Sequence, residues 1–87
     1  MKVFIIGVGL IGGSLAKDLK SIGDFQLTGI DKNKLNLNFA LKNGIIDRLG
    51  KINEIIKANI VILGVDVESA IDLLPKILTL INNNCLV

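Results

Sequence analysis

The chain opens with a short apolar run that leads directly into a glycine-rich turn. Residues Val3–Ile6 are all apolar, and the pattern G-x-G-x-x-G follows. In a strand–turn–helix unit, Gly7 allows the sharp turn, Gly9 lets phosphates approach bare backbone, and Gly12 lets the helix lie close to the strand. A helix that begins near Leu10 directs its free N–H groups and positive dipole end at an anion. The motif predicts a dinucleotide-binding turn; the alternative is a strand-to-helix turn that binds nothing.

Apolar runs alternate with helix-like stretches along the rest of the chain. Strands are expected at Val3–Ile6, Phe25–Ile30, Ile45–Arg48, Ile60–Leu63 and from Cys85 onward. Helical segments are expected at 10–21, 34–43, 52–56 and from 67, with a break at Pro75, which lacks an N–H. Right-handed crossovers then give an α/β fold with a doubly wound parallel sheet, Rossmann-like, of strand order 3-2-1-4-5 and incomplete at its C-terminal end. The ligand crevice is expected between strands 1 and 4, where the winding reverses.

The spacing of apolar residues predicts which face of each helix meets the sheet. The residues expected to point inward are Ile11, Leu15, Leu19 and Ile22 in the first helix, Leu37, Ala40 and Leu41 in the second, and Val67, Ala70, Ile71 and Leu74 after the fourth strand. Asp66 is a good N-cap for that last helix, and Glu68 suits its positive end.

Composition restricts the classes of function. With 87 residues the chain forms one domain, residues 1–87, and its 3% aromatic content leaves aliphatic side chains to fill the core. The net charge of +2 comes from scattered residues, and without an aromatic platform we expect no nucleic-acid partner. No apolar stretch approaches the ~20 residues of a membrane span, and the start of the chain does not resemble a signal peptide.

Cysteine and histidine content argues against several kinds of chemistry. Cys85 is the single cysteine, so no intrachain disulfide is possible, and a cytoplasmic location is expected. The absence of histidine removes the commonest general base and metal ligand, so we predict neither a metal site nor a catalytic residue. Ser14 lies on the first helical turn, where packing or phosphate contact is expected. Four acidic residues are candidates for acid–base work, but each falls on a helix face or turn expected to be solvated: Asp18, Asp47, Glu54 and Asp72.

Asp31 closes the second apolar run, about 20 residues after the glycines. At that position of a dinucleotide fold, a carboxylate accepts hydrogen bonds from the adenosine ribose. It also repels a 2′-phosphate, which favours NAD over NADP, although the neighbouring cation Lys32 would attract that phosphate. The alternative role for Asp31 is the N-cap of the next helix.

Several stretches together resemble the amino-terminal domain of prephenate dehydrogenases. The double glycine followed by Ser14 and the Gly-Ile-Ile-Asp segment are more particular than the general glycine pattern. The resemblance covers essentially the whole chain, and it is carried by Gly7–Ala16, Gly29–Asp31, Ala40, Gly44–Asp47 and Val61–Val65.

The resemblance implies an NAD-dependent oxidation of prephenate, coupled to decarboxylation, that yields 4-hydroxyphenylpyruvate for tyrosine biosynthesis. It implies cofactor contacts at Gly7, Val8, Gly9, Leu10, Ile11, Gly12, Asp31, Lys32, Gly64 and Val65. The family's substrate-binding residues and helical dimerisation domain would lie beyond Val87. We therefore expect these 87 residues alone to be inactive, a full-length protein to be a homodimer, and the open sheet edge at Cys85–Val87 to favour self-association.

Two other interpretations of the pattern remain open. One is the NAD(P)-binding domain of another small-substrate dehydrogenase or reductase. The other is a nucleotide-sensing module without catalytic activity.

Overall fold

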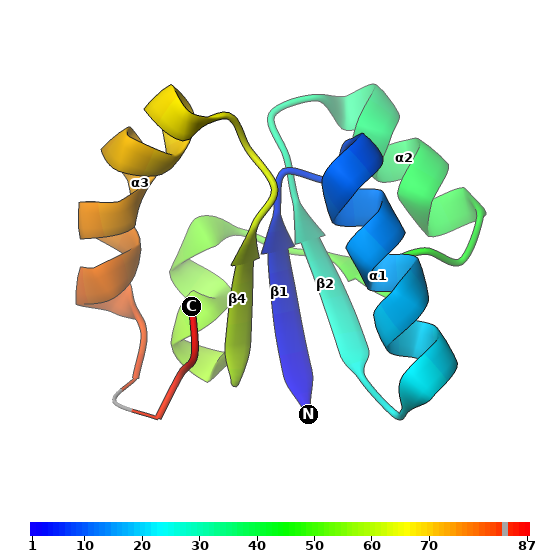
Figure 1. The fold of residues 1–87 in the computed structure, drawn as a ribbon, viewed down its shortest axis with the longest axis horizontal. Helices are drawn as coiled ribbons and strands as arrows, with labels where there is room; N and C mark the ends of the chain where they lie inside the picture. The colour runs from blue at the N-terminus through cyan, green and yellow to red at the C-terminus, as the bar shows by residue number, and fades with distance from the viewer. Residues whose placement is uncertain (83) are drawn as a thin grey trace.

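A four-stranded parallel sheet forms the centre of the molecule (Figure 1). The computed structural model describes residues 1–82 and 84–87, without the side chains of Leu10 and Ile11. The strands are β1 (Lys2–Ile6), β2 (Gln26–Ile30), β3 (Arg48–Leu49) and β4 (Ile60–Leu63), in the order β3-β2-β1-β4. The helices are α1 (Leu10–Ile22), α2 (Lys34–Lys42), the 3₁₀ helix η1 (Ile52–Lys57) and α3 (Val67–Leu80). The predicted α/β class and the order of the first four strands are confirmed.

β1 lies in the middle because its side chains supply both layers of the core. Val3 and Ile5 pack with residues of α1 and α2, whereas Phe4 and Ile6 pack with residues of η1 and α3. β1 pairs in parallel with β2 on one side and with β4 on the other. The winding therefore reverses between β1 and β4, as predicted, and the carboxyl ends of these strands meet at one edge of the sheet.

The expected fifth strand is reduced to a single contact. Leu86 forms an isolated parallel bridge with Ile60, on the outer side of β4 where the fifth strand was predicted. The Leu86 N–H donates to the Asn59 carbonyl at 2.9 Å, and the Leu86 carbonyl accepts from the Val61 N–H at 2.8 Å. This segment therefore covers only the first part of the β4 edge.

The third strand begins later than the predicted Ile45–Arg48. The N–H groups of Ile45 and Ile46 both donate to the carbonyl of Ala40, at 2.8 and 3.3 Å, and so they complete the end of α2. The Ile46 side chain is fully buried in the core beside α2. The part of this segment that pairs with β2 is Arg48–Leu49.

The predicted buried faces of α1 and α3 are wrong in part. In α1, Leu19 packs against the core as predicted, but Leu15 and Ile22 are 42% and 75% exposed, and the small residue Ala16 is buried. In α3, Val67 and Ile71 are 76% and 65% exposed. The residues of α3 that meet the core are Leu73, Ile77 and Leu80.

Pro75 does not break α3, which is a further correction to the predicted elements. The helix continues from Val67 to Leu80 with Pro75 inside it. Proline removes the hydrogen bond to the carbonyl of Ile71. Both residues are exposed, so this stretch of the helix lies on the solvent side.

Candidate functional site

Two glycines of the opening turn are required by the fold. Gly7 has φ +93°, and a Cβ there would lie 2.7 Å from the Val65 side chain and 2.8 Å from the Gly64 carbonyl. A Cβ at Gly12 would collide with the carbonyl oxygen of Gly7. The chain therefore turns sharply after β1, and α1 lies directly against that turn, as predicted.

Gly9 is different because no contact among the described residues requires it to be glycine. Its φ is −93°, which any residue can adopt, and a Cβ there would meet no atom of the described residues within 4 Å, apart from its chain neighbours. Gly9 is also the N-cap of α1, without a side-chain cap and without an acidic residue in the first turn. The backbone thus presents open space at the positive end of a helix, which is the environment a phosphate needs.

Asp31 connects this turn to the end of β2. Its carboxylate accepts hydrogen bonds from the N–H of Val8 and the N–H of Asn33, both at 2.9 Å. The side-chain oxygen of Asn33 caps α2 by accepting from Leu35 and Asn36. The alternative role of Asp31 as the N-cap of α2 is therefore wrong, since Asn33 takes that position.

The turn after β4 packs against the glycine turn. The Gly64 N–H donates to the Ile6 carbonyl at 2.7 Å, and a Cβ at Gly64 would collide with the carbonyl of Gly7. Glycine at position 64 is therefore explained by the closeness of the two turns. Val65 lines the cavity described below.

Asp66 turns towards α3, as predicted from the sequence. Its carboxylate accepts from the backbone N–H of Ser69 at 2.8 Å and from the Ser69 hydroxyl at 3.2 Å. The hydrogen bond from the Ser69 backbone, followed by that from its hydroxyl, holds the pKa of Asp66 below its ordinary value. The carboxylate is thus engaged at the start of α3.

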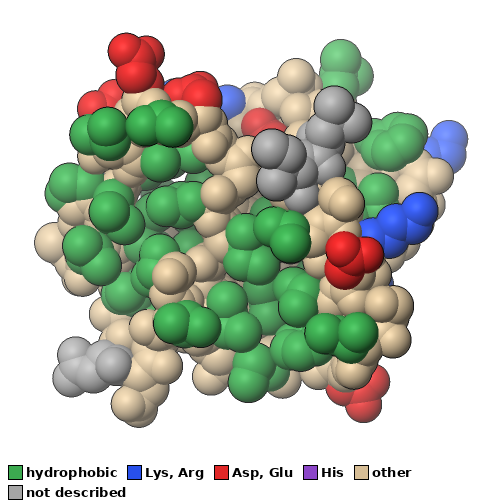
Figure 2. All heavy atoms as spheres, viewed as in Figure 1, with side chains coloured by type: hydrophobic (Ala, Val, Ile, Leu, Met, Phe, Trp, Pro, Cys, Tyr) green, Lys and Arg blue, Asp and Glu red, His purple; other side chains and the backbone are tan. Residues whose placement is uncertain are grey.

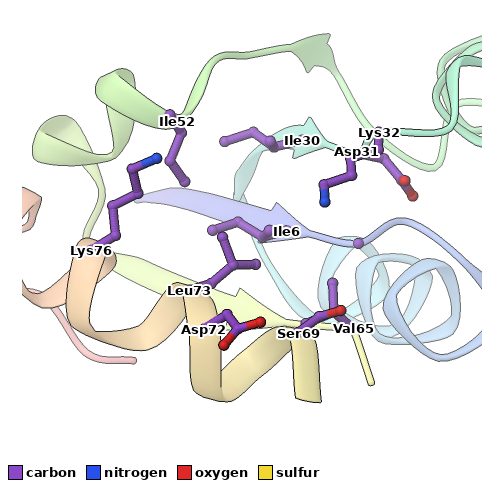
Figure 3. A pocket seen from close by; sticks show the side chains of 11 residues that line it. Ile6, Ile30, Asp31, Lys32, Ile52, Val65, Ser69, Asp72, Leu73 and Lys76 are labelled. Carbon is purple, nitrogen blue, oxygen red and sulfur yellow. The ribbon is translucent and has the colours of Figure 1, made fainter. Parts of the chain in front are cut away.

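A cavity of about 350 Å³ lies at the carboxyl ends of β1, β2 and β4, on the side of η1 and α3 (Figure 3). Four of the predicted site residues line it: Gly7, Asp31, Lys32 and Val65. Most of its wall is apolar, from Ile6, Ile30, Ile52 and Leu73. Val8 and Gly9 line a shallower hollow of about 490 Å³ on the other side of the turn, towards α1 and α2. The predicted residues Leu10 and Ile11 lie outside the described side chains.

Three polar residues of α3 complete the cavity, and sequence reasoning did not assign them to the site. They are Ser69, Asp72 and Lys76, and Asp72 had been expected on a solvated surface. Their spacing of three and four residues places them on one flank of the helix. That spacing is visible in the sequence, but only the packing of α3 through Leu73 and Ile77 turns this flank towards the ends of the strands.

The charges of the cavity are not paired with one another. Among the described residues, the ion pairs are Lys20–Asp47 and Arg48–Glu54, and neither lines the cavity. The cavity is thus lined by two cations, Lys32 and Lys76, and by two carboxylates, Asp31 and Asp72, beside its apolar wall. Within the same part of the chain, no three of His, Cys, Asp or Glu are grouped as a metal site. No helix over those residues has the length and apolar character needed to cross a membrane.

Comparison with known families gives a match to "Prephenate dehydrogenase, nucleotide-binding domain" over residues 15–87. A curated prephenate dehydrogenase from Lactococcus lactis subsp. cremoris is 38% identical over 80 residues, which cover 90% of this chain and 22% of that protein.

Solved structures that resemble this chain are also prephenate or arogenate dehydrogenases. The prephenate dehydrogenase of Aquifex aeolicus, in complex with hydroxyphenyl propionate and NAD+, superposes with a TM-score of 0.89 at 28% identity. Synechocystis arogenate dehydrogenase superposes with a TM-score of 0.87 at 27% identity. Each match covers 98% of this chain and 31% of the other. The chain thus spans less than a third of the length of these relatives.

Proposed function

Because the chain belongs to the prephenate dehydrogenase family, we propose that it is the NAD-binding part of an enzyme that oxidises prephenate or arogenate. NAD would supply the acceptor for the hydride removed from the substrate. The reaction proposed for the whole enzyme is oxidation of prephenate coupled to its decarboxylation, which gives 4-hydroxyphenylpyruvate. The chain's own residues hold and orient the cofactor, and none of them is proposed as a general acid or base.

The observation that carries this proposal is the open space at Gly9 before an uncapped helix. The pyrophosphate would sit there, against the backbone around Val8 and Gly9 and at the first turn of α1. Gly64 and Val65, in the turn after β4, lie against Gly7 of the same glycine turn. These contacts are made by backbone groups, which explains why the site needs few polar side chains.

Asp31 is proposed to hold the adenosine ribose. Each carboxylate oxygen accepts one strong hydrogen bond from the backbone, which leaves lone pairs for the two ribose hydroxyls. Because those bonds fix the carboxylate, it meets a ribose without further ordering. A 2′-phosphate would bring like charge against it, so NAD is favoured, while Lys32 offsets part of that repulsion.

Calorimetric titration of the protein with NAD+ and NADP+ tests the cofactor assignment. We expect NAD+ to bind at least tenfold more tightly, and Asp31→Ser to abolish that preference by removing both the ribose acceptor and the repulsive charge. Asp24→Asn, which removes an exposed acid outside the site, is the matched control. Tighter binding of NADP+ by the unmodified protein would contradict the role of Asp31.

Activity requires a separate measurement. In the full-length enzyme we expect NAD+ reduction that depends on prephenate or arogenate, and no turnover by residues 1–87 alone. NAD+ binding by a full-length protein that turns over neither compound would favour a sensing module instead. A cytoplasmic location and a homodimer of the full-length protein remain predictions of the same proposal.

A further inference from the structure

The sequence holds one Asn-Gly pair, Asn43–Gly44, and the structure places it on the surface at the end of α2. Both residues are exposed. Gly44 has φ +69°, and a Cβ there would meet no atom of the described residues within 4 Å, apart from its chain neighbours. The backbone nitrogen of Gly44 follows the Asn43 side chain directly, and no side chain on Gly44 shields it. The Asn43 amide is therefore open to attack by its own backbone.

In the folded structure, the backbone at Asn43 has the wrong conformation for that attack. A five-membered ring closes only when Cβ of Asn43 and the nitrogen of Gly44 are eclipsed about the Cα–C bond. At the observed ψ of 9°, the nitrogen of Asn43 itself eclipses the Gly44 nitrogen. The Asn43 side-chain N–H donates to the Phe39 carbonyl at 2.8 Å, and the Gly44 N–H donates to the Leu41 carbonyl at 3.2 Å. Both hydrogen bonds must break before the ring can close.

The two residues that follow also depend on this turn. The N–H groups of Ile45 and Ile46 donate to the Ala40 carbonyl, and the Ile46 side chain is 1% exposed. A Cβ at Gly29 would lie 2.7 Å from Cδ1 of Ile46, which shows how closely that side chain covers β2. Rotation about the Asn43 backbone carries Ile45 and Ile46 away from these contacts. The reactive conformation therefore requires the last turn of α2 to open.

We propose that Asn43 is a deamidation site, and that it reacts while the last turn of α2 is open and the sheet remains folded. The Gly44 nitrogen gives its proton to hydroxide and attacks Cγ of Asn43, so a C–N bond forms. The bond from Cγ to the side-chain nitrogen breaks, and that nitrogen takes a proton from water and leaves as ammonia. Water then opens the cyclic imide at either carbonyl, which leaves aspartate or isoaspartate at position 43.

Either product damages the end of α2. Aspartate places a negative charge at the C-terminal end of a helix, where the dipole opposes it, and it lacks the donor that binds the Phe39 carbonyl. Isoaspartate also adds a methylene group to the main chain, so the bonds from Ile45 and Ile46 to Ala40 cannot both re-form. Because Ile46 and Val8 belong to the same buried cluster, the damage reaches the packing beneath the glycine turn.

Mass spectrometry with peptide mapping measures this reaction in the 87-residue chain during incubation in mildly alkaline buffer. We expect Asn43 to become the acid at least tenfold more slowly than in a synthetic peptide of residues 39–48, because two hydrogen bonds must first break. Asn33, an exposed asparagine followed by lysine, is the internal comparison and should stay intact. Asn43→Gln should abolish the modification, because its longer side chain would have to close a less favourable six-membered ring.

Two valine variants separate local opening from global unfolding. Ile46→Val removes one methylene from the side chain that holds the end of α2 in place, so it should speed the reaction about threefold. Ile77→Val removes the same group from a fully buried residue of the other core layer, and it should leave the rate unchanged. Circular dichroism verifies that both variants are folded.

Three outcomes would overturn the proposal. A chain that reacts as fast as the peptide would show that no opening is needed. Equal acceleration by Ile46→Val and Ile77→Val would show that the reaction follows global unfolding. Reaction at Asn43 no faster than at Asn33 would exclude the Asn-Gly pair as the site. The binding of NAD is measured separately and does not depend on any of these results.

Discussion

At the scale of single residues, the glycines of one motif meet different demands. Gly7 and Gly12 are fixed by the protein's own atoms, since a Cβ at either position would collide with neighbouring backbone. Gly9 has an ordinary φ, and the described residues beyond its chain neighbours leave open space where its Cβ would be. The sequence motif does not distinguish these three glycines. In the structure, Gly7 and Gly12 shape the turn, whereas Gly9 leaves space that a ligand can occupy.

This separation predicts opposite effects for two alanine substitutions. Gly12→Ala should lower the free energy of unfolding by about 2 kcal/mol or more, because α1 must move away from the turn. Gly9→Ala should change it by less than about 0.5 kcal/mol but weaken NAD+ binding at least tenfold. Urea unfolding followed by circular dichroism, together with calorimetric titration, measures both. A stable Gly12→Ala variant, or unchanged binding in Gly9→Ala, would contradict the assignment.

The sequence predicts the role of a polar residue when that role depends on its chain neighbours, and not when it depends on a distant loop. Asp66 was correctly expected to cap α3, because the sequence places it directly before the helix. The role of Asp31 in holding Val8 depends on a contact between two separate loops. Local patterns predict caps within one element, but they do not specify contacts of that kind.

At the scale of elements, the sequence predicts where helices lie better than which side they bury. The positions of β1, β2 and β4 and of α1, α2 and α3 follow from the apolar pattern, whereas β3 begins later than predicted. In α3, however, two apolar stripes share the helix: one through Leu73 and Ile77, the other through Val67 and Ile71. In α1, burial follows the close approach at Gly12 and Ala16 rather than the largest side chains. Apolar spacing alone does not distinguish such stripes.

Asp47 joins three elements near the amino end of β2. Its carboxylate accepts from the Leu27 N–H at 2.8 Å and from Lys20 of α1 at 2.6 Å. Burial raises the pKa of this carboxyl, but the hydrogen bonds from Leu27 and Lys20 and the charge of Lys20 outweigh it, so the pKa lies below its ordinary value. The Gly-Ile-Ile-Asp segment of the sequence thus ends in a residue that holds α1 and β2 together.

The depressed pKa makes the contribution of Asp47 depend on pH. It is fully present above the ordinary carboxyl pKa and is lost as pH falls through the lower folded value. Asp47→Asn keeps an acceptor for Leu27 but loses the charge, so it should cost about 1 kcal/mol at pH 7 after allowance for solvent screening. The difference should shrink as pH falls below the ordinary carboxyl pKa and vanish once the folded carboxylate is protonated. Urea unfolding across this range measures it, and a difference independent of pH would exclude the charge as its origin.

At the scale of the whole molecule, one face carries an unusual amount of exposed apolar surface. Apolar side chains gather over α3 and towards the middle of the view in Figure 2. On α3 they are Val67, Ile71, Leu74 and Leu78, all exposed, and Leu86 and Val87 are exposed beside the partly covered edge of β4. Such a surface favours association with another chain.

We therefore predict that residues 1–87 self-associate as their concentration rises. The second apolar stripe of α3 adds to the sheet edge expected from the sequence, so Ile71→Glu should shift the equilibrium towards the monomer without disturbing the core. Light scattering over a concentration series, with Glu68→Gln as a control on the same helix, follows the equilibrium. A clean monomer at high concentration would show that this face does not pair with itself.

Binding of NAD at the opening turn is the central claim, and amide chemical shifts observed by NMR during an NAD+ titration test it most directly. The account predicts saturable shifts at the backbone of Val8 and Gly9, at Asp31, and at Gly64 and Val65, with residues of α2 that face solvent unaffected. Saturating NAD+ that leaves the amides of Gly7–Gly12 unchanged would contradict it.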